Sequence, residues 1–151
     1  NWASTLTLNI GDSFGVSVGD CVITETGDLV GVISETGSNW STCTTIIDTD
    51  TSIGAQIFRT GDIGVARGDF SLMGQNRLQL AYLDADASPQ VGDLVVTSGL
   101  GGYYPSQLVI GTVDEVMTDD DGLAQYAVLT PAVDLSALSQ VFVITDFSIV
   151  E

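Results

Sequence analysis

Apolar and polar residues alternate along much of this chain with a period of two. Between Ser4 and Ile10, the residues Leu6, Leu8 and Ile10 alternate with threonine and asparagine. This is the pattern of a strand with one buried face. Similar patterns favour ten further strands, at 21–24, 29–35, 42–47, 53–60, 63–67, 77–83, 94–97, 108–116, 124–129 and 141–145.

Turn signals separate these segments. Glycine–aspartate pairs stand at 11–12, 19–20, 27–28, 61–62, 68–69 and 92–93. Glycine adopts positive φ at little cost and aspartate hydrogen-bonds to the backbone that follows it, so each pair is typical of a turn. Asp121-Gly122 favours a hairpin. Short strands with closely spaced turns predict an all-β barrel or sandwich.

The remaining signals concern helices and lobes. Segment 133–139 could form one helical turn, with Asp134 or Ser136 as its cap. The number of strands fits two lobes of roughly six strands each, and loop 84–91 is the best place for a boundary or crossover. We place the first lobe at 1–65, with the final strand, 141–147, as a further candidate member. The second lobe is then 66–151.

The charge balance excludes several functions. The chain has 20 carboxylates, three arginines, no lysine and no histidine, which gives a formal net charge of −17. Such a chain repels phosphate backbones and anionic bilayers, so we expect no nucleic-acid partner. No apolar stretch is long enough to span a bilayer. The chain begins with Asn1, and we take it as a piece of a longer protein.

Catalytic and ligand motifs are weak here. Residues 11–15 match G-x-S-x-G, but without histidine or lysine no general base can activate Ser13, so a turn is favoured. Residues 99–102 lack the spacing of a phosphate loop, and 119–122 lack the alternate ligands of a calcium loop. We therefore expect no metal and no cofactor.

Two questions stay open on the residues alone. Cys21 and Cys43 both lie in strand segments and could be two buried thiols or a disulfide. Two carboxylates across a cleft are the only catalytic set that the composition allows, so a carbohydrate-active module is the alternative to a non-catalytic protein.

One segment resembles a known family. Residues 91–105 contain Gly92-Asp93-Leu-Val-Val-Thr97-Ser98-Gly99, followed by a proline and by Ile110-Gly111-Thr-Val113. This order resembles the signature of the MreC family of rod shape-determining proteins. Segments 15–23, 29–33, 60–65, 131–135 and 141–144 also resemble that family, although Ser106-Gln107 stands where the family often has glycine and a basic residue.

The resemblance implies a non-catalytic scaffold of the bacterial cell-wall elongation complex. Members are membrane proteins whose transmembrane helix and coiled coil precede an extracytoplasmic β region. That region is similar to two six-stranded barrels, distantly like the lobes of chymotrypsin-type proteases. The implied partners are the elongation transpeptidase (a class B penicillin-binding protein), MreD, RodA, the MreB system and a second copy of the protein.

The signature also supplies the candidate site residues. Tyr103, Tyr104 and Pro105 could offer an aromatic anchor to a partner, because tyrosine is common at interface hot spots. Packing of this loop on its own barrel is the alternative. Exposed strand edges are a second way to bind a partner. A structural role is expected for the other signature residues, which are Gly92, Asp93, Thr97, Ser98, Gly99 and Gly111.

Overall fold

The chain folds as an all-β protein. The computed structural model describes residues 4–118, 122 and 124–147, and within them eleven strands are formed. All eleven segments that alternation predicted contain a strand. They are β1 (Thr5–Leu8), β2 (Cys21–Ile23), β3 (Leu29–Thr36), β4 (Ser41–Thr45), β5 (Ser52–Ile57), β6 (Ile63–Arg67), β7 (Leu78–Leu83), β8 (Leu94–Thr97), β9 (Val109–Thr118), β10 (Gln125–Pro131) and β11 (Phe142–Ile144).

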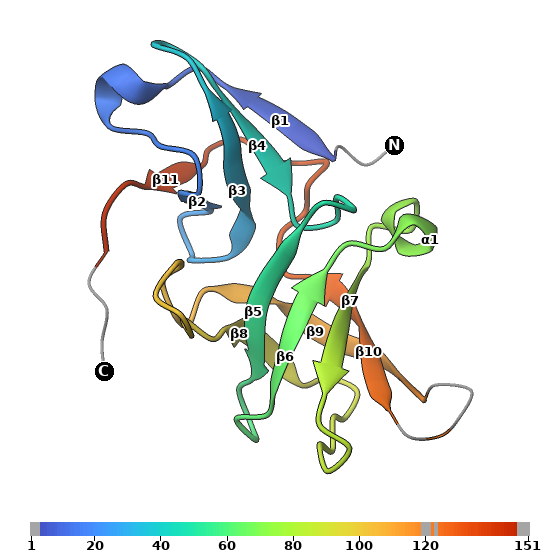
Figure 1. Cartoon of the computed structure of the whole chain (residues 1–151). Coiled ribbons are helices and arrows are strands. Elements are labelled where there is room, and N and C mark those ends of the chain that lie inside the picture. The colour runs from blue at the N-terminus through green and yellow to red at the C-terminus, as the bar shows by residue number, and fades with distance from the viewer. Residues whose placement is uncertain (1–3, 119–121, 123, 148–151) are drawn as a thin grey trace.

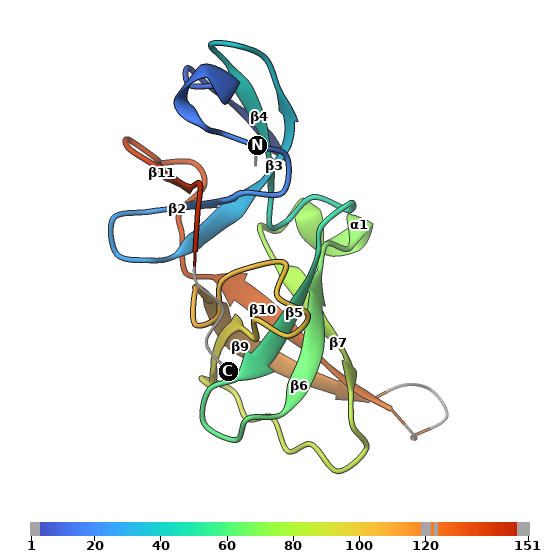
Figure 2. The ribbon, with the colours of Figure 1, turned by 60° about the vertical axis from the view of Figure 1, so that its left-hand side comes forward.

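Six of the strands close into a barrel. Their order around it is β10-β7-β6-β5-β8-β9, and every neighbouring pair is antiparallel. Side chains that point inward are removed from water, as the 0% exposure of Leu80, Val95, Ile110 and Leu129 shows. The barrel forms the lower lobe in Figure 1 and Figure 2.

The other five strands form a second sheet in the order β1-β4-β3-β2-β11. It lies above the barrel, and the chain returns to it from the barrel to form β11 (Figure 2). Within the described residues β1 pairs only with β4 and β11 only with β2. The prediction of two six-stranded barrels is therefore correct for one lobe, whereas the other is a five-stranded sheet with two edges.

The lobes divide earlier in the chain than the predicted boundary at 65 and 66. Strands β5 and β6 pair with barrel strands, so the change of sheet falls between Thr45 and Ser52. Loop 84–91 is not the boundary between the lobes, because it lies between β7 and β8, which both belong to the barrel. The sequence of β5 does not indicate which sheet the strand joins, because alternation determines the buried face of a strand but not its neighbours.

Short helical turns differ from the prediction. A four-residue helix, α1 (Phe70–Met73), is capped by the Asp69 carboxylate, which accepts a hydrogen bond from the Ser71 amide. A 3-10 turn, η1 (Asp12–Phe14), occupies the G-x-S-x-G segment. Segment 133–139 is a turn and not a helix, although Asp134 does accept from the Ser136 amide. The hairpin tip at Asp121 lies outside the described residues.

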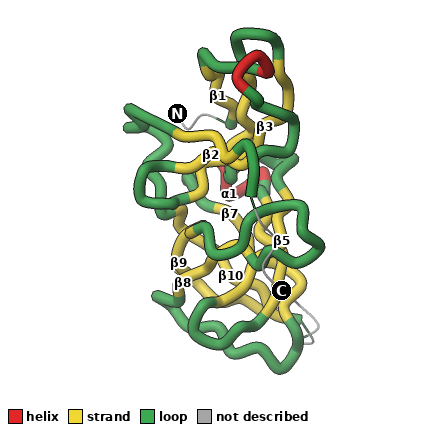
Figure 3. Tube along the Cα trace, turned by 90° about the vertical axis from the view of Figure 1, so that its left-hand side faces the viewer, coloured by secondary structure: helices red, strands yellow, loops and turns green. Residues whose placement is uncertain are grey.

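The two lobes share one continuous hydrophobic cluster. At their junction, Asp28 beside β3 bridges to Val109 of β9, and the Val109 amide donates to the carbonyl of Gly27. Figure 3 shows the resulting elongated molecule, with the five-stranded sheet stacked on one end of the barrel. No helix among the described residues is long and apolar enough to cross a membrane.

Candidate interaction site

The signature loop, residues 98–108, connects β8 to β9 and is held at its base by Thr97. The Thr97 hydroxyl donates to the carbonyl of Pro105 at 2.7 Å and accepts from the Leu108 amide at 2.9 Å. The main chain of Thr97 also pairs with Leu108 and Gln107. Because Thr97 is fully buried, these bonds are shielded from water and fix the two ends of the loop against each other.

A second fixed point is the ion pair between Asp93 and Arg59. The Asp93 carboxylate accepts from Nε of Arg59 at 2.8 Å, from its Nη2 at 3.0 Å and from the Gln90 amide at 2.8 Å. The same guanidinium donates to the carbonyl of Ser88. The hydrogen bond from Arg59 lowers the pKa of Asp93. The aspartate of the signature therefore ties the chain before β8 to the end of β5.

Two glycines of the signature occupy positions that exclude a side chain. A Cβ on Gly111 would lie 2.1 Å from the Thr130 carbonyl oxygen, because β9 and β10 approach closely there. Gly99 has φ of +71°, and a Cβ on it would lie 2.7 Å from Cβ of Ser106. The Ser98 hydroxyl accepts from the Leu100 amide inside the same loop. These contacts shape the loop and its barrel.

The two tyrosines of the signature loop have different surroundings. Tyr103 is 80% exposed and Leu100 is 66% exposed, so together they present apolar surface to solvent. Tyr104 is half-buried against the core and, with Val32 and Ile53, lines a cavity of about 230 Å³ between the lobes. Burial raises the pKa of its hydroxyl, and a negative charge on Cys21 would add to this shift.

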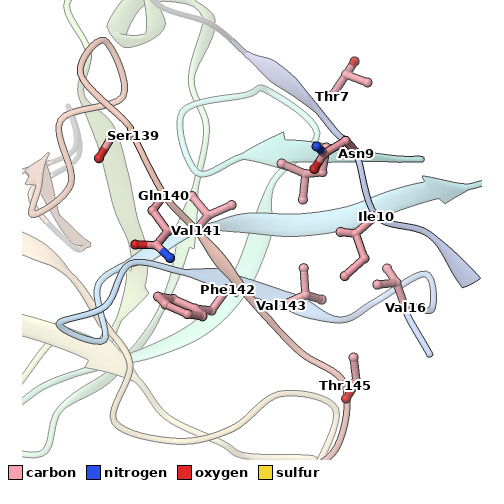
Figure 4. Close-up of a pocket in the computed structure, with 11 residues that line it drawn as sticks. Thr7, Asn9, Ile10, Val16, Ser139, Gln140, Val141, Phe142, Val143 and Thr145 are labelled. Carbon is pink, nitrogen blue, oxygen red and sulfur yellow. The ribbon is translucent and has the colours of Figure 1, made fainter. Parts of the chain in front are cut away.

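A groove that sequence reasoning missed lies between the two edges of the five-stranded sheet. It has a volume of about 740 Å³. Ile10 and Val16 lie on one side of it and Val143 on the other, as Figure 4 shows. It is lined by Thr7, Leu8, Asn9, Ile10, Val16, Ser139, Gln140, Val141, Phe142, Val143 and Thr145.

Three polar side chains, those of Ser13, Asp69 and Asp93, have structural partners. The Ser13 hydroxyl donates to the carbonyl of Ser38 at 2.6 Å, so it closes a turn. Asp69 and Asp93 have their pKa lowered by hydrogen bonds, the opposite of what a general acid needs. Among the described residues, no three metal-ligating side chains gather.

Both cysteines are buried and free. Cys21 lies on β2 and Cys43 on β4, on either side of β3, so the disulfide alternative does not hold in this structure. Desolvation raises the pKa of each thiol to about 12.

The family model described as "Rod shape-determining protein MreC, barrel core" matches residues 1–145, a range that takes in both sheets and the signature loop. The chain belongs to the MreC family. Its curated relatives include the cell shape-determining protein MreC of Geobacillus stearothermophilus, 33% identical over 95% of this chain. The MreC of Listeria monocytogenes is also 33% identical over 95%. The chain spans about half the length of these two relatives, 52% and 49%.

Solved MreC structures have the same fold. The crystal structure of MreC from Pseudomonas aeruginosa superposes with a TM-score of 0.84 at 27% identity, covering 95% of this chain and 90% of that one. The Listeria MreC structure also gives 0.84, at 32% identity, covering 95% of this chain and 68% of that one. Another MreC neighbour, with 25% identity, a TM-score of 0.73 and coverage of 89% and 81%, is described as a major periplasmic domain. These MreC relatives are named as shape-determining proteins and not as enzymes.

Proposed function

We propose that this chain is the partner-binding β region of a non-catalytic scaffold in the bacterial cell-wall elongation complex. Its membership of the MreC family over residues 1–145 is the observation that carries the proposal. The elongation transpeptidase is the primary partner. A Helicobacter pylori MreC of the same fold, 18% identical with a TM-score of 0.74, was solved in complex with the penicillin-binding protein PBP2. That complex supports the choice of partner.

The wider assembly follows from the same proposal. MreD, RodA and the MreB system belong to the complex, and the full-length protein self-associates. The β region works on the extracytoplasmic face of the membrane, anchored by a helix outside this chain. The likeness of its two lobes to those of chymotrypsin-type proteases stays a prediction.

The signature loop supplies the contact in this proposal. Tyr103 and Leu100 are exposed, while Thr97 and the Asp93–Arg59 pair hold the loop that carries them. A rigidly held aromatic side chain loses little conformational freedom on binding, which makes it an effective anchor. Tyr104 and Pro105 position Tyr103: the first packs against the core, and the carbonyl of the second is bonded to Thr97.

The test is calorimetric titration of this chain with the ectodomain of the elongation transpeptidase from its own species. We expect saturable binding that Tyr103→Ala weakens by at least about tenfold, equivalent to about 1.4 kcal/mol. The matched control is Phe70→Ala, because Phe70 is equally exposed, at 81%, but lies on α1 on the other side of the barrel (Figure 1).

Each outcome has a definite meaning. Equal weakening by Tyr103→Ala and Phe70→Ala would show that general apolar surface, and not the signature loop, drives binding. Saturable binding unaffected by either variant would keep the scaffold and move the contact elsewhere. Absence of binding by the folded chain would overturn the proposal that the β region is sufficient to bind the transpeptidase.

A further inference from the structure

The five-stranded sheet has the geometry of a six-stranded barrel that lacks one strand. All four of its neighbouring pairs are antiparallel. The two edges, β1 and β11, are four steps apart, so they run in the same direction. They cannot close on each other as an antiparallel pair, whereas one strand between them would be antiparallel to both. The neighbouring barrel, with six strands, meets this requirement without help.

Unpaired backbone groups face the groove from both edges. The Thr45 amide donates to the Ser4 carbonyl, so by the alternation of an antiparallel ladder Leu6 and Leu8 bond toward β4. The backbone groups of Thr7 and Asn9 then point toward the groove. Asp20 and Thr24, which flank β2, bond toward β3 and the turn before it, as their main-chain hydrogen bonds show.

The same alternation settles the direction on β11. Cys21 and Ile23 alternate with residues that bond toward β3, so they bond to their partners Ile144 and Phe142. The backbone groups of Val141, Val143 and Thr145 therefore point toward the groove. All five of these groove-facing residues line the groove.

The core beneath the groove is incompletely covered. Leu8, Ile10, Val141 and Val143 pack against the hydrophobic cluster but remain partly exposed. Equivalent inward side chains of the closed barrel, such as Leu80 and Val95, are 0% exposed. A strand with apolar side chains on its inner face would cover these residues and would bond to both edges, as in β-strand addition.

We propose that the groove between β1 and β11 binds an extended, positively charged segment of a partner protein, which inserts as a sixth strand antiparallel to both edges. The residues that line the groove are uncharged, so the charge of the occupant is inferred from the lobe as a whole. Residues 1–51 hold seven carboxylates and no lysine, arginine or histidine, and all three arginines of the chain lie on or beside barrel strands. A second copy of this chain would bring another net charge of −17 to the groove, which disfavours it.

The proposal does not depend on which protein supplies the strand. The probe is a capped peptide of alternating lysine and valine, about eight residues long, the length of an ordinary strand. Valine would face the core and lysine the solvent. Matched control peptides carry glutamate for lysine, or keep the lysines and carry N-methyl groups on alternate residues. The N-methyl groups preserve the charge but remove the amide donors on one side.

The readout is amide hydrogen exchange of the folded chain followed by NMR. We expect the lysine–valine peptide to slow exchange at Thr7, Asn9, Val143 and Thr145 by at least about tenfold. The glutamate and N-methylated peptides should bind at least about tenfold more weakly. Thr7→Pro should weaken binding as strongly, because it removes a groove-facing donor from an edge strand, where proline is tolerated.

The matched control for that variant is Thr7→Ala, which removes the exposed side chain but keeps the groove-facing amide donor, so it should change binding little. Equal binding of the N-methylated peptide, or protection of amides elsewhere, would reduce the interaction to charge attraction and overturn the proposal. Protection of the groove amides without peptide would overturn it as well. Protection that rises with protein concentration would mean that a second copy of the chain occupies the groove. Protection that does not depend on concentration would mean that a segment of the same chain occupies it. Should Thr7→Pro not fold, the peptide series decides alone.

Discussion

The two lobes of this MreC-family chain are built from similar strands but differ in closure and in charge. The barrel pairs each of its strands on both sides, and its inner side chains are fully buried. Within the described residues, the five-stranded sheet leaves β1 and β11 with one neighbour each, and inner residues along these two edges, such as Leu8 and Val143, are partly exposed. An even number of strands can close with every pair antiparallel, whereas an odd number needs one parallel pair. One strand therefore separates the closed lobe from the lobe with two edges.

The charge distribution follows the same division. Arg59 pairs with Asp93, Arg77 pairs with Asp114 and Glu115, and Arg67 lies 5.4 Å over the ring of Tyr82. All of these contacts lie on the barrel. The barrel thus neutralises part of its acidity internally, whereas the five-stranded sheet has no internal cation with which to do so. We expect the barrel to act as the rigid part of the molecule and the five-stranded sheet to offer unpaired strand edges for binding.

The largest effect should come from filling the closest strand contact of the barrel. In Gly111→Ala the new Cβ would lie 2.1 Å from the Thr130 carbonyl oxygen, and both atoms belong to paired strands that cannot move apart cheaply. We expect a loss of more than about 3 kcal/mol in the free energy of unfolding, or failure to fold. Urea denaturation followed by circular dichroism measures this.

The control for that change is Gly74→Ala. Gly74 has φ of −65°, and a Cβ there meets open space, so its stability should change little. Wild-type stability in Gly111→Ala would show that the barrel is looser than its pairing indicates, and the contrast between the lobes would weaken.

The next effect concerns the thiols of the five-stranded sheet. Burial raises the pKa of Cys21 and Cys43 to about 12 from 9.0. A protonated thiol is therefore favoured by folding, so this stability is complete below pH 9.0 and is lost as the pH rises from there toward 12. Each thiol should contribute a slope of up to about 1.4 kcal/mol per pH unit.

Comparison with the double variant Cys21→Ala/Cys43→Ala isolates this contribution, because tyrosine ionisation affects both proteins. We expect urea midpoints measured across alkaline pH to fall more steeply for the wild type than for the variant. Parallel curves would mean that the thiols are hydrated in the folded state, and that this sheet is more open to water than its buried cysteines indicate.

Comparison of sequence and structure shows what local pattern can and cannot determine. Alternation located every strand because burial of one face is a local property. The missing histidine and lysine excluded a serine nucleophile because no base could activate Ser13. Strand partners depend on contacts distant in sequence, so the change of sheet before Ser52 and the groove between β1 and β11 were missed. Tyr103 and Tyr104 are identical in chemistry, and only the packing of their loop separates an exposed ring from a half-buried one.

The smallest effect tests whether the barrel needs its ion pair to hold the signature loop. Asp93→Ala removes the acceptor of Arg59 and of the Gln90 amide, and we expect it to cost about 1–2 kcal/mol at neutral pH. Hydrogen bonding from Arg59 lowers the pKa of Asp93 below 3.8, so its stabilisation is complete above that value and disappears as the pH falls through the folded-state pKa. Urea midpoints of wild type and variant should therefore converge in acid.

Asp86→Ala removes the same charge from an exposed position in the neighbouring loop, and it should leave the midpoint nearly unchanged at every pH. If both variants behaved alike, the pair would be an ordinary surface contact, and the loop that carries Tyr103 would owe its rigidity to Thr97 alone.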